Sequence, residues 1–194
     1  MTARLIFICH ASTDAVRRSA FPADEPLDGI GKREAAALAG SVPSADQIWS
    51  SPELRARETA QALGLKAAVE PALRDCDYGK WSGQSFDDVS AREPDAVATW
   101  LHDPAAAPHG GESLLELSQR VASWLGGQLS QRGQSIVVTH AAIIRAAIVH
   151  AIEATPQSFW RIDIAPLSCA RLSGNEGRWN LIATGCAMNG GKII

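Results

Sequence analysis

The sequence predicts an α/β fold, in which helices pack on a mostly parallel sheet. Two short apolar runs, residues 5–8 and 136–139, are rich in β-prone side chains and too short for helices. Such runs are typical of strands that are buried on both faces of a parallel sheet. Residues 141–152 follow the second run directly and have a strongly helical composition. The order strand then helix is the order that this fold class requires.

A histidine stands at or just beyond the end of each run. Cys9 and His10 follow the first run, and His140 follows the second. If the two strands are neighbours, about 4.8 Å apart, both imidazoles face one cleft at the carboxyl edge of the sheet, where ligands of such folds collect. Amide groups at the start of the helix after His140 would favour an anion there. Alone, His10 could simply end a strand, but the repetition favours a shared functional site.

The composition indicates one ordinary globular domain, residues 1–194. A net charge of -3, with both signs interspersed, argues against a nucleic-acid surface. The four cysteines, Cys9, Cys76, Cys169 and Cys186, form no C-x-x-C pair, so neither a disulfide framework nor a zinc ribbon is indicated. No signal peptide or membrane-spanning run is recognised, and the cytoplasm is the expected compartment.

Beyond the first strand, residues 14–26 carry Arg17 and Arg18 together with two prolines and three acidic residues. This composition predicts a loop over the mouth of the cleft. Asp28 is suited to cap the amino end of a helix at residues 32–39.

Residues 47–50 predict a second strand, which delivers a helix over residues 52–63 with Pro52 in its first turn. Arg55 lies near the start of this helix and close to the strand end, so it is expected to reach the cleft. Arg57 lies about 200° further round the helix and is expected to face solvent.

A weak third strand is predicted at residues 67–69, followed by a glycine-punctuated loop at residues 73–83. Asp75 and Asp77 in this loop are candidates for a general acid, and the alternative is that they cap turns. Residues 86–101 are expected to be mostly helical.

A proline- and glycine-rich connector, residues 104–111, leads to a helix predicted at residues 112–129. Its core-facing stripe is Leu114, Leu117, Val121, Leu125 and Leu129. Two interpretations stay open for Glu112 at the helix start: it faces the cleft, or it only complements the helix dipole.

The carboxyl-terminal part predicts a helical turn at residues 156–160 and then extended segments. These segments are residues 161–164, 167–172 and 179–184. A glycine-containing turn at residues 174–177 joins the last two as a hairpin. Residues 189–191 are expected to form a loose tail.

Taken together, these pieces resemble the histidine phosphatase superfamily, the phosphoglycerate-mutase-like proteins. The matching segments are residues 8–13, 26–31, 50–60, 75–83, 110–113 and 138–146. The resemblance implies a three-layer α/β/α sandwich on a mostly parallel sheet, and phosphoryl transfer through a phosphohistidine without a metal or another cofactor. Within this superfamily, the chain resembles the smaller phosphatase branch that includes the α-ribazole phosphatases.

The resemblance also implies roles for particular residues. His10 would be the nucleophile, and Asp75 would be the acid that protonates the leaving oxygen. His140 and Arg55 would hold the phosphoryl oxygens. These roles suit the chemistry, because a neutral imidazole can attack in line and spread negative charge needs fixed donors.

One position departs from the family motif. The family has Arg-His-Gly at the end of the first strand, whereas this chain has Cys9, His10 and Ala11. A thiol cannot imitate the planar donor fork of a guanidinium, and losing one such donor typically costs about 10²–10³ in rate. Arg17 or Arg18 is a candidate substitute, so the predicted phosphate-binding group comprises Arg55, Cys9, Arg17 and Glu112.

Three hypotheses follow. The first is a phosphatase acting on a small phosphorylated metabolite, with an altered phosphate pocket, as a monomer or homodimer. The second is a catalytically weak or inactive protein of the same fold that binds a phosphorylated ligand. The third is a zinc site formed by Cys9, His10 and His140 with Asp75. A cysteine-based phosphatase is not indicated, because no arginine closes a tight phosphate loop after Cys9.

Overall fold

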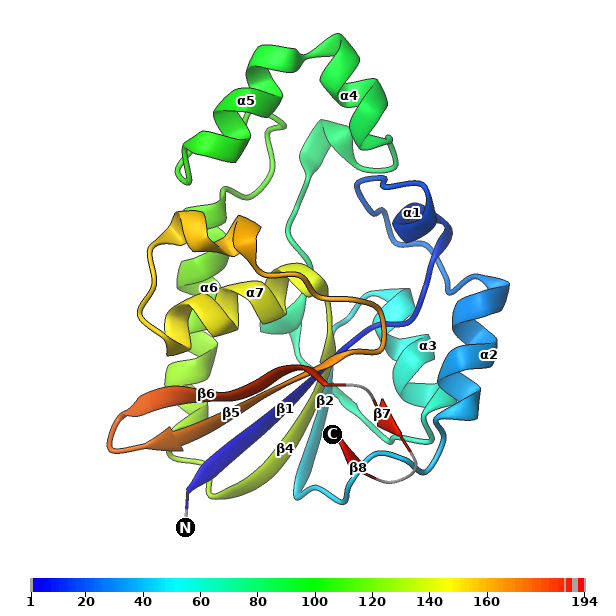
Figure 1. The fold of residues 1–194 in the computed structure, drawn as a ribbon, viewed down its shortest axis with the longest axis vertical. Coiled ribbons are helices and arrows are strands. Elements are labelled where there is room, and N and C mark those ends of the chain that lie inside the picture. Colours follow the sequence, from blue (N-terminus) through cyan, green and yellow to red (C-terminus); the bar gives the residue numbers. More distant parts are fainter. Residues whose placement is uncertain (1, 187, 190–191, 194) are drawn as a thin grey trace.

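The computed structural model of the chain describes residues 2–186, 188–189 and 192–193. Its main sheet has six strands in the order β3-β2-β4-β1-β5-β6 (Figure 1). The first four in this order pair in parallel, and β5 and β6 join in antiparallel fashion. The strands are β1 (Ala3–Cys9), β2 (Gln47–Ser50), β3 (Ala68–Val69), β4 (Gly133–Thr139), β5 (Cys169–Asn175) and β6 (Arg178–Cys186). A separate two-stranded sheet pairs β7 (Met188–Asn189) with β8 (Lys192–Ile193).

Helices cover both faces of the main sheet, with α2 and α3 on one side and α6 and α7 on the other (Figure 1). The α-helices are α1 (Asp14–Arg17), α2 (Gly29–Ala37), α3 (Leu54–Ala62), α4 (Phe86–Arg92), α5 (Pro94–His102), α6 (Leu114–Gln128) and α7 (Ala141–Ala151). Three 3₁₀ turns are η1 (Pro71–Leu73), η2 (Gly79–Trp81) and η3 (Pro156–Arg161). The predicted α/β sandwich on a mostly parallel sheet is thereby confirmed.

The side chains of β1 alternate between the two layers. Leu5 and Phe7 pack with the buried faces of α6 and α7, whereas Ile6 and Ile8 pack with those of α2 and α3. This alternation is the period-2 pattern of a strand that is buried on both faces. The continuous apolar run that predicted the strand is therefore explained by a helix layer on each side.

The carboxyl ends of β1, β4 and β2 meet at one edge of the sheet. In the parallel pairing of β1 with β4, Cys9 stands opposite Thr139, and the His10 amide donates to the Thr139 carbonyl at 2.8 Å. β2 pairs with the other side of β4. The segment that follows β2 therefore begins beside His140.

Close packing at this edge depends on a glycine in α2. A Cβ atom on Gly31 would overlap the carbonyl oxygen of Ser12. Asp28 caps α2, as predicted, because its side chain accepts the amide hydrogens of Ile30 and Gly31. The Ser12 hydroxyl donates to the same carboxylate. The helix start is thus attached to the segment that leaves His10.

Element ends shift by a few residues, as where α2 begins at Gly29 instead of residue 32, and four further details differ from the sequence expectations. The loop at residues 14–26 contains α1, and Pro52 precedes the cap of α3 instead of lying in its first turn. Glu112 precedes the α6 cap, Ser113, so it is not part of the helix start. Residues 161–164 form no strand: Arg161 ends η3, and the Ile162 carbonyl accepts from the Arg145 side chain instead of from a sheet neighbour.

The last part of the chain agrees with the expected hairpin. Glu176 and Gly177 both have positive φ, as a two-residue type I′ turn requires, and they join β5 to β6. In the predicted tail, Asn189 belongs to β7, whereas residues 190 and 191 lie outside the described residues.

A third hydrophobic cluster lies under α4 and α5, which project at one end of the molecule (Figure 1). Phe21, Trp81 and Trp100 are its largest members, with ring centroids 5.2 to 5.7 Å apart. No helix in the described ranges is both long enough and apolar enough to cross a membrane.

Candidate active site

Four of the predicted site residues lie together at the carboxyl edge of the sheet. His10 follows β1, His140 caps α7, Arg55 lies in the first turn of α3, and Asp75 follows η1. The His10 and His140 ring centroids are 5.2 Å apart. Asp75 Oδ2 lies 2.7 Å from Arg55 Nη2 and 3.4 Å from His140 Nδ1. One charged cluster therefore contains two imidazoles, a guanidinium and a carboxylate.

The hydrogen bonding of His10 fixes which nitrogen carries its proton. Nδ1 lies 2.8 Å from the Ala11 carbonyl oxygen, and a carbonyl can only accept, so Nδ1 is the donor. Burial, together with the charges of His140 and Arg55, lowers the pKa of His10 from 6.5 to about 3. The neutral ring therefore keeps a lone pair on Nε2, which has no hydrogen-bond partner among the described residues.

Arg55 is almost fully buried and only partly paired. Nη1 donates to the Ala23 carbonyl at 2.6 Å, and Nη2 donates to Asp75. The buried Nε has no partner among the residues that the structure describes. Leaving a buried donor unsatisfied is costly, so this N–H is available to an acceptor that enters the site.

Asp75 is held as a carboxylate. Burial alone would raise its pKa, but the charges of His140 and Arg55 and the Cys76 amide outweigh burial and lower it. The carboxyl group is thus ionised at neutral pH when no ligand is bound.

Sequence reasoning missed Glu53, which caps α3 and contacts His140. Its Oε2 lies 3.1 Å from His140 Nε2, and its Oε1 accepts the Asp75 amide at 3.2 Å. The Ser51 hydroxyl also contacts both Glu53 and His140 Nε2. Although burial opposes it, hydrogen bonding and the charge of His140 lower the pKa of Glu53 to about 2. An acidic residue just before a helix usually complements the dipole, so no sequence signal distinguished this one.

Cys9 is buried in the core on the α6–α7 side of the sheet. Burial and the nearby Asp75 charge raise the pKa of the Cys9 thiol to about 12. A neutral thiol is a poor nucleophile and a poor metal ligand. Among the described residues, no three His, Cys, Asp or Glu side chains converge closely enough to hold a metal ion.

Arg17 does not join the cluster. Its side chain is 56% exposed and lies 3.9 Å from Asp28, whereas Arg18 pairs with Asp14. Neither guanidinium contacts His10, Arg55 or His140 within the described part of the chain. The replacement of the missing motif arginine by one of them stays a prediction, and in this structure both guanidinium groups lie outside the cluster.

Glu112 is also not placed as a phosphate ligand. Its carboxylate forms a bidentate pair with Arg120 and lies 3.4 Å from Arg74. Both oxygens face guanidinium groups, so the structure gives Glu112 other partners, and its phosphate-binding role stays a prediction. Arg120 was missed by the sequence reasoning, because an arginine on a long amphipathic helix usually faces solvent.

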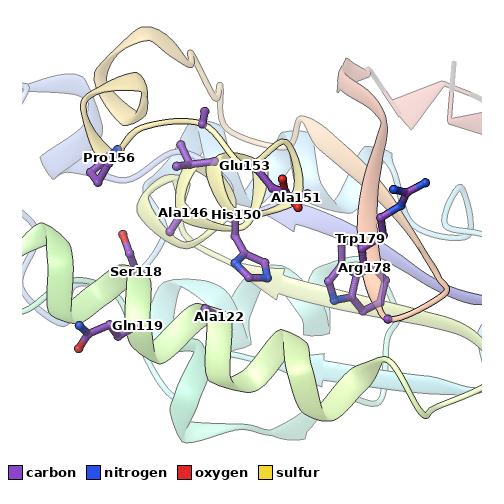
Figure 2. Close-up of a pocket in the computed structure, with 13 residues that line it drawn as sticks. Ser118, Gln119, Ala122, Ala146, His150, Ala151, Glu153, Pro156, Arg178 and Trp179 are labelled. Carbon is purple, nitrogen blue, oxygen red and sulfur yellow. The ribbon is translucent and has the colours of Figure 1, made fainter.

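A separate pocket of about 450 Å³ lies between α6, α7 and the β5–β6 hairpin. Figure 2 shows Ser118, His150 and Trp179 among its lining residues. It shares no residue with the cluster around His10. The candidate chemistry is therefore located elsewhere than in this pocket.

Comparisons with known proteins agree on one family. The family model described as histidine phosphatase superfamily (branch 1) matches residues 5–186. A bifunctional protein of Mycobacterium tuberculosis is 31% identical over 180 residues, which cover 86% of this chain and 50% of that protein. The chain thus spans about half the length of the curated relatives that head the comparison.

Other relatives match over more of their own length. Glucosyl-3-phosphoglycerate phosphatase of Mycobacterium tuberculosis is 31% identical over 176 residues, which cover 81% of this chain and 78% of that protein. Phosphoserine phosphatase 1 of Hydrogenobacter thermophilus is 29% identical over 168 residues, covering 81% of this chain and 80% of that protein.

Solved structures show the same fold. A mycobacterial glucosyl-3-phosphoglycerate phosphatase in complex with VO3 superposes with a TM-score of 0.82 at 26% identity, covering 94% of this chain and 98% of that one. A putative α-ribazole-5'-P phosphatase from Escherichia coli superposes with a TM-score of 0.84 at 23% identity, covering 98% of this chain and all of that one. At this identity the second likeness concerns the fold alone.

Proposed function

The chain belongs to the histidine phosphatase superfamily (branch 1), and from this premise we propose that it hydrolyses a small phosphorylated metabolite through a phosphohistidine at His10. The observation that carries the proposal is the state of His10. Its ring is neutral, its Nδ1–H is fixed by the Ala11 carbonyl, and its Nε2 lone pair is free beside His140. These are the requirements for a nitrogen nucleophile.

In the first step, the Nε2 lone pair forms a bond to phosphorus while the bond from phosphorus to the leaving oxygen breaks. Arg55, with its unpaired Nε–H, and His140 would hold the phosphoryl oxygens. Fixed donors of this kind stabilise the charge of the transferring group, which is most of what a phosphoryl-transfer enzyme has to do.

Asp75 is the group proposed to donate a proton to the leaving oxygen. In this structure Arg55 and His140 lower its pKa, so it is ionised. A phosphate dianion beside it has the opposite effect, since like charge raises the pKa of a carboxyl group. It also competes for the Arg55 donors. Substrate binding therefore favours protonation of Asp75.

The second step returns the site to its starting state. Water attacks phosphorus while the bond from phosphorus to Nε2 breaks, and the Asp75 carboxylate accepts the proton of the water. The products are the alcohol and inorganic phosphate. Neither step uses a metal ion or another cofactor.

The pocket of this chain is altered relative to the family motif, in our proposal, because Cys9 stands where the motif has arginine. A buried neutral thiol supplies no strong donor. We therefore expect weaker binding of the phosphoryl group than in a site with both arginines. The substrate class is a phosphate monoester, and we propose that residues 1–194 act as one domain.

A second candidate function is phospholigand binding without turnover. It is favoured by the two carboxylates, Asp75 and Glu53, which already engage Arg55 and His140. A phosphorylated ligand must displace these contacts, which weakens or slows its binding. A protein with such a site can bind the ligand without hydrolysing it.

The test is phosphate release from p-nitrophenyl phosphate in the presence of a chelator. The wild-type protein should release phosphate, and His10→Ala should release none. His150 is exposed and lines the separate pocket between α6 and α7, so the control variant His150→Ala should match the wild type. Activity that appears only with added zinc would contradict the phosphohistidine route. Thermal stabilisation by phosphate without release would favour the second candidate.

A further inference from the structure

Arg120 on α6 reaches across to the segment that carries Asp75. Its Nη1 donates to the carbonyl oxygens of Ala72 at 2.7 Å and Arg74 at 2.9 Å. Its Nη2 donates to the carbonyl oxygen of Asp75 itself at 3.2 Å. One side chain thus binds three carbonyl groups in a four-residue stretch.

Glu112 orients this guanidinium. Its two oxygens accept from Arg120 Nε at 2.8 Å and from Nη2 at 2.6 Å. An arginine has five N–H donors in a fixed fork, and these five contacts match that number. The side chains are 16% and 8% exposed, so water competes little for these bonds.

Asp75 needs an external support of this kind because it lies between η1 and η2, outside any helix or strand. Its amide donates to Glu53, and its carbonyl accepts from Arg120. The peptide groups on both sides of Asp75 are therefore fixed by side chains from other parts of the fold. The carboxyl group between them stays at 2.7 Å from Arg55.

Building on the proposed function, we propose that Arg120, oriented by Glu112, is a positioning residue that holds Asp75 in place to protonate the leaving group. A misplacement of about 1 Å at a reacting group can cost about 10²-fold in rate. The loss of rate on substituting Arg120 should therefore depend on how strongly the leaving group needs a proton. It should be large for an alkyl phosphate, whose alkoxide leaves poorly, and small for an aryl phosphate with an acidic phenol.

The experiment compares kcat/KM for 2,4-dinitrophenyl phosphate with kcat/KM for glycerol 2-phosphate, because kcat/KM reports the steps up to release of the leaving group and not the later attack of water, in which Asp75 acts for both esters alike. Arg120→Lys keeps the charge but offers three donors from one atom, so it cannot reproduce the five contacts. We expect a loss of about 10- to 100-fold on the alkyl ester and less than about threefold on the dinitrophenyl ester, within the range of general acid catalysis. Asp75→Asn should show the same selectivity to a larger extent.

Arg74→Lys is the matched control, because Arg74 also faces Glu112 but donates to none of the three carbonyls. It should change both rates by the same small factor. If Arg120→Lys does not fold, as judged by circular dichroism, Glu112→Gln is tested in its place. It should also lose more rate on the alkyl ester than on the dinitrophenyl ester, by a smaller factor. Equal losses of kcat/KM on both esters, in whichever of the two variants folds, would overturn the positioning role.

The two proposals fail differently. If wild-type protein releases phosphate from neither ester, the proposed function is wrong. If the wild type is active and Asp75→Asn is selective but Arg120→Lys and Glu112→Gln are not, only the role of Arg120 is wrong.

Discussion

The imidazole rings of His10 and His140 face each other across two neighbouring parallel strands, with centroids 5.2 Å apart and an interplanar angle of 60°. The two residues are far apart in the sequence, and the pairing of β1 with β4 brings them together. Around them, Arg55 and Asp75 form a buried ion pair. Four predictions follow from this geometry and from the burial of neighbouring groups.

Arg55→Lys should lower kcat/KM for phosphate monoesters by about 10²–10³-fold, the usual cost of one preorganised donor. Lysine keeps the charge but cannot bind the Ala23 carbonyl, Asp75 and a phosphoryl oxygen together, as the guanidinium fork can. Steady-state kinetics with an aryl phosphate measures the loss. Arg57→Lys on the same helix, where Arg57 is exposed, should leave kcat/KM unchanged. Similar values for both variants would remove Arg55 from the phosphate site.

His10 should make the protein sensitive to mild acid. Because its pKa falls from 6.5 to about 3 on folding, the unfolded chain binds more protons in this window. The contribution of neutral His10 to the free energy of unfolding is therefore fully present above about pH 6.5, and it is lost as the pH falls toward 3. Between pH 7 and pH 5 the free energy of unfolding should drop by about 2 kcal/mol less in His10→Gln than in the wild type. Urea unfolding at the two pH values measures this difference.

The control for that measurement is His102→Gln, because His102 is exposed at the end of α5. It should show the pH dependence of the wild type. If His10→Gln also shows the wild-type dependence, the His10 ring is not held neutral in the folded protein.

Cys9→Arg should lower the melting temperature, because it buries a guanidinium in a core site that now holds a neutral thiol. If position 9 faces the anion, as we propose, phosphate should raise the melting temperature of Cys9→Arg more than that of the wild type, through a charge-assisted contact. Thermal melts with and without phosphate provide the readout, with Cys9→Ala as the control for lost packing. An equal phosphate effect in all three proteins would place position 9 away from the anion.

Alkylation should not lower the proposed phosphatase activity. The pKa of Cys9 and that of Cys169 are both raised to about 12 by burial, so almost no thiolate is present at pH 8. Iodoacetamide should therefore leave phosphate release unchanged while the protein is folded, and it should react with all four cysteines in urea. If iodoacetamide rapidly inactivates the wild type but not Cys9→Ser, the prediction is wrong, and Cys9 has a catalytic or metal-binding role.

Sequence reasoning was strongest where a local sequence pattern implied the topology of the sheet. Short apolar runs predicted buried strands, and the carboxyl ends of neighbouring parallel strands meet at one edge of the sheet. This rule placed His10 beside His140, and the short link from β2 placed Arg55 beside them. None of these steps required knowledge of side-chain partners.

Sequence reasoning was weakest where only tertiary partners decide the role of a side chain. Glu112 and Glu53 both precede helices, and nothing local shows that one binds Arg120 and the other His140. Arg17 and Arg18 were expected near the phosphate because they are close in sequence. The short helix α1 instead leaves them exposed, in ion pairs with Asp28 and Asp14. Burial and pairing of charged side chains are properties of the assembled fold.

The parallel pairing of β1 with β4 also has a consequence during synthesis. Chains are made from the amino end, and β4 comes after more than half of the residues. A nascent chain that ends before β4 contains His10 and Asp75 but lacks the strand that aligns them with His140. No such fragment can assemble the paired imidazoles, so the reactive site forms only after β4 and His140 have been synthesised.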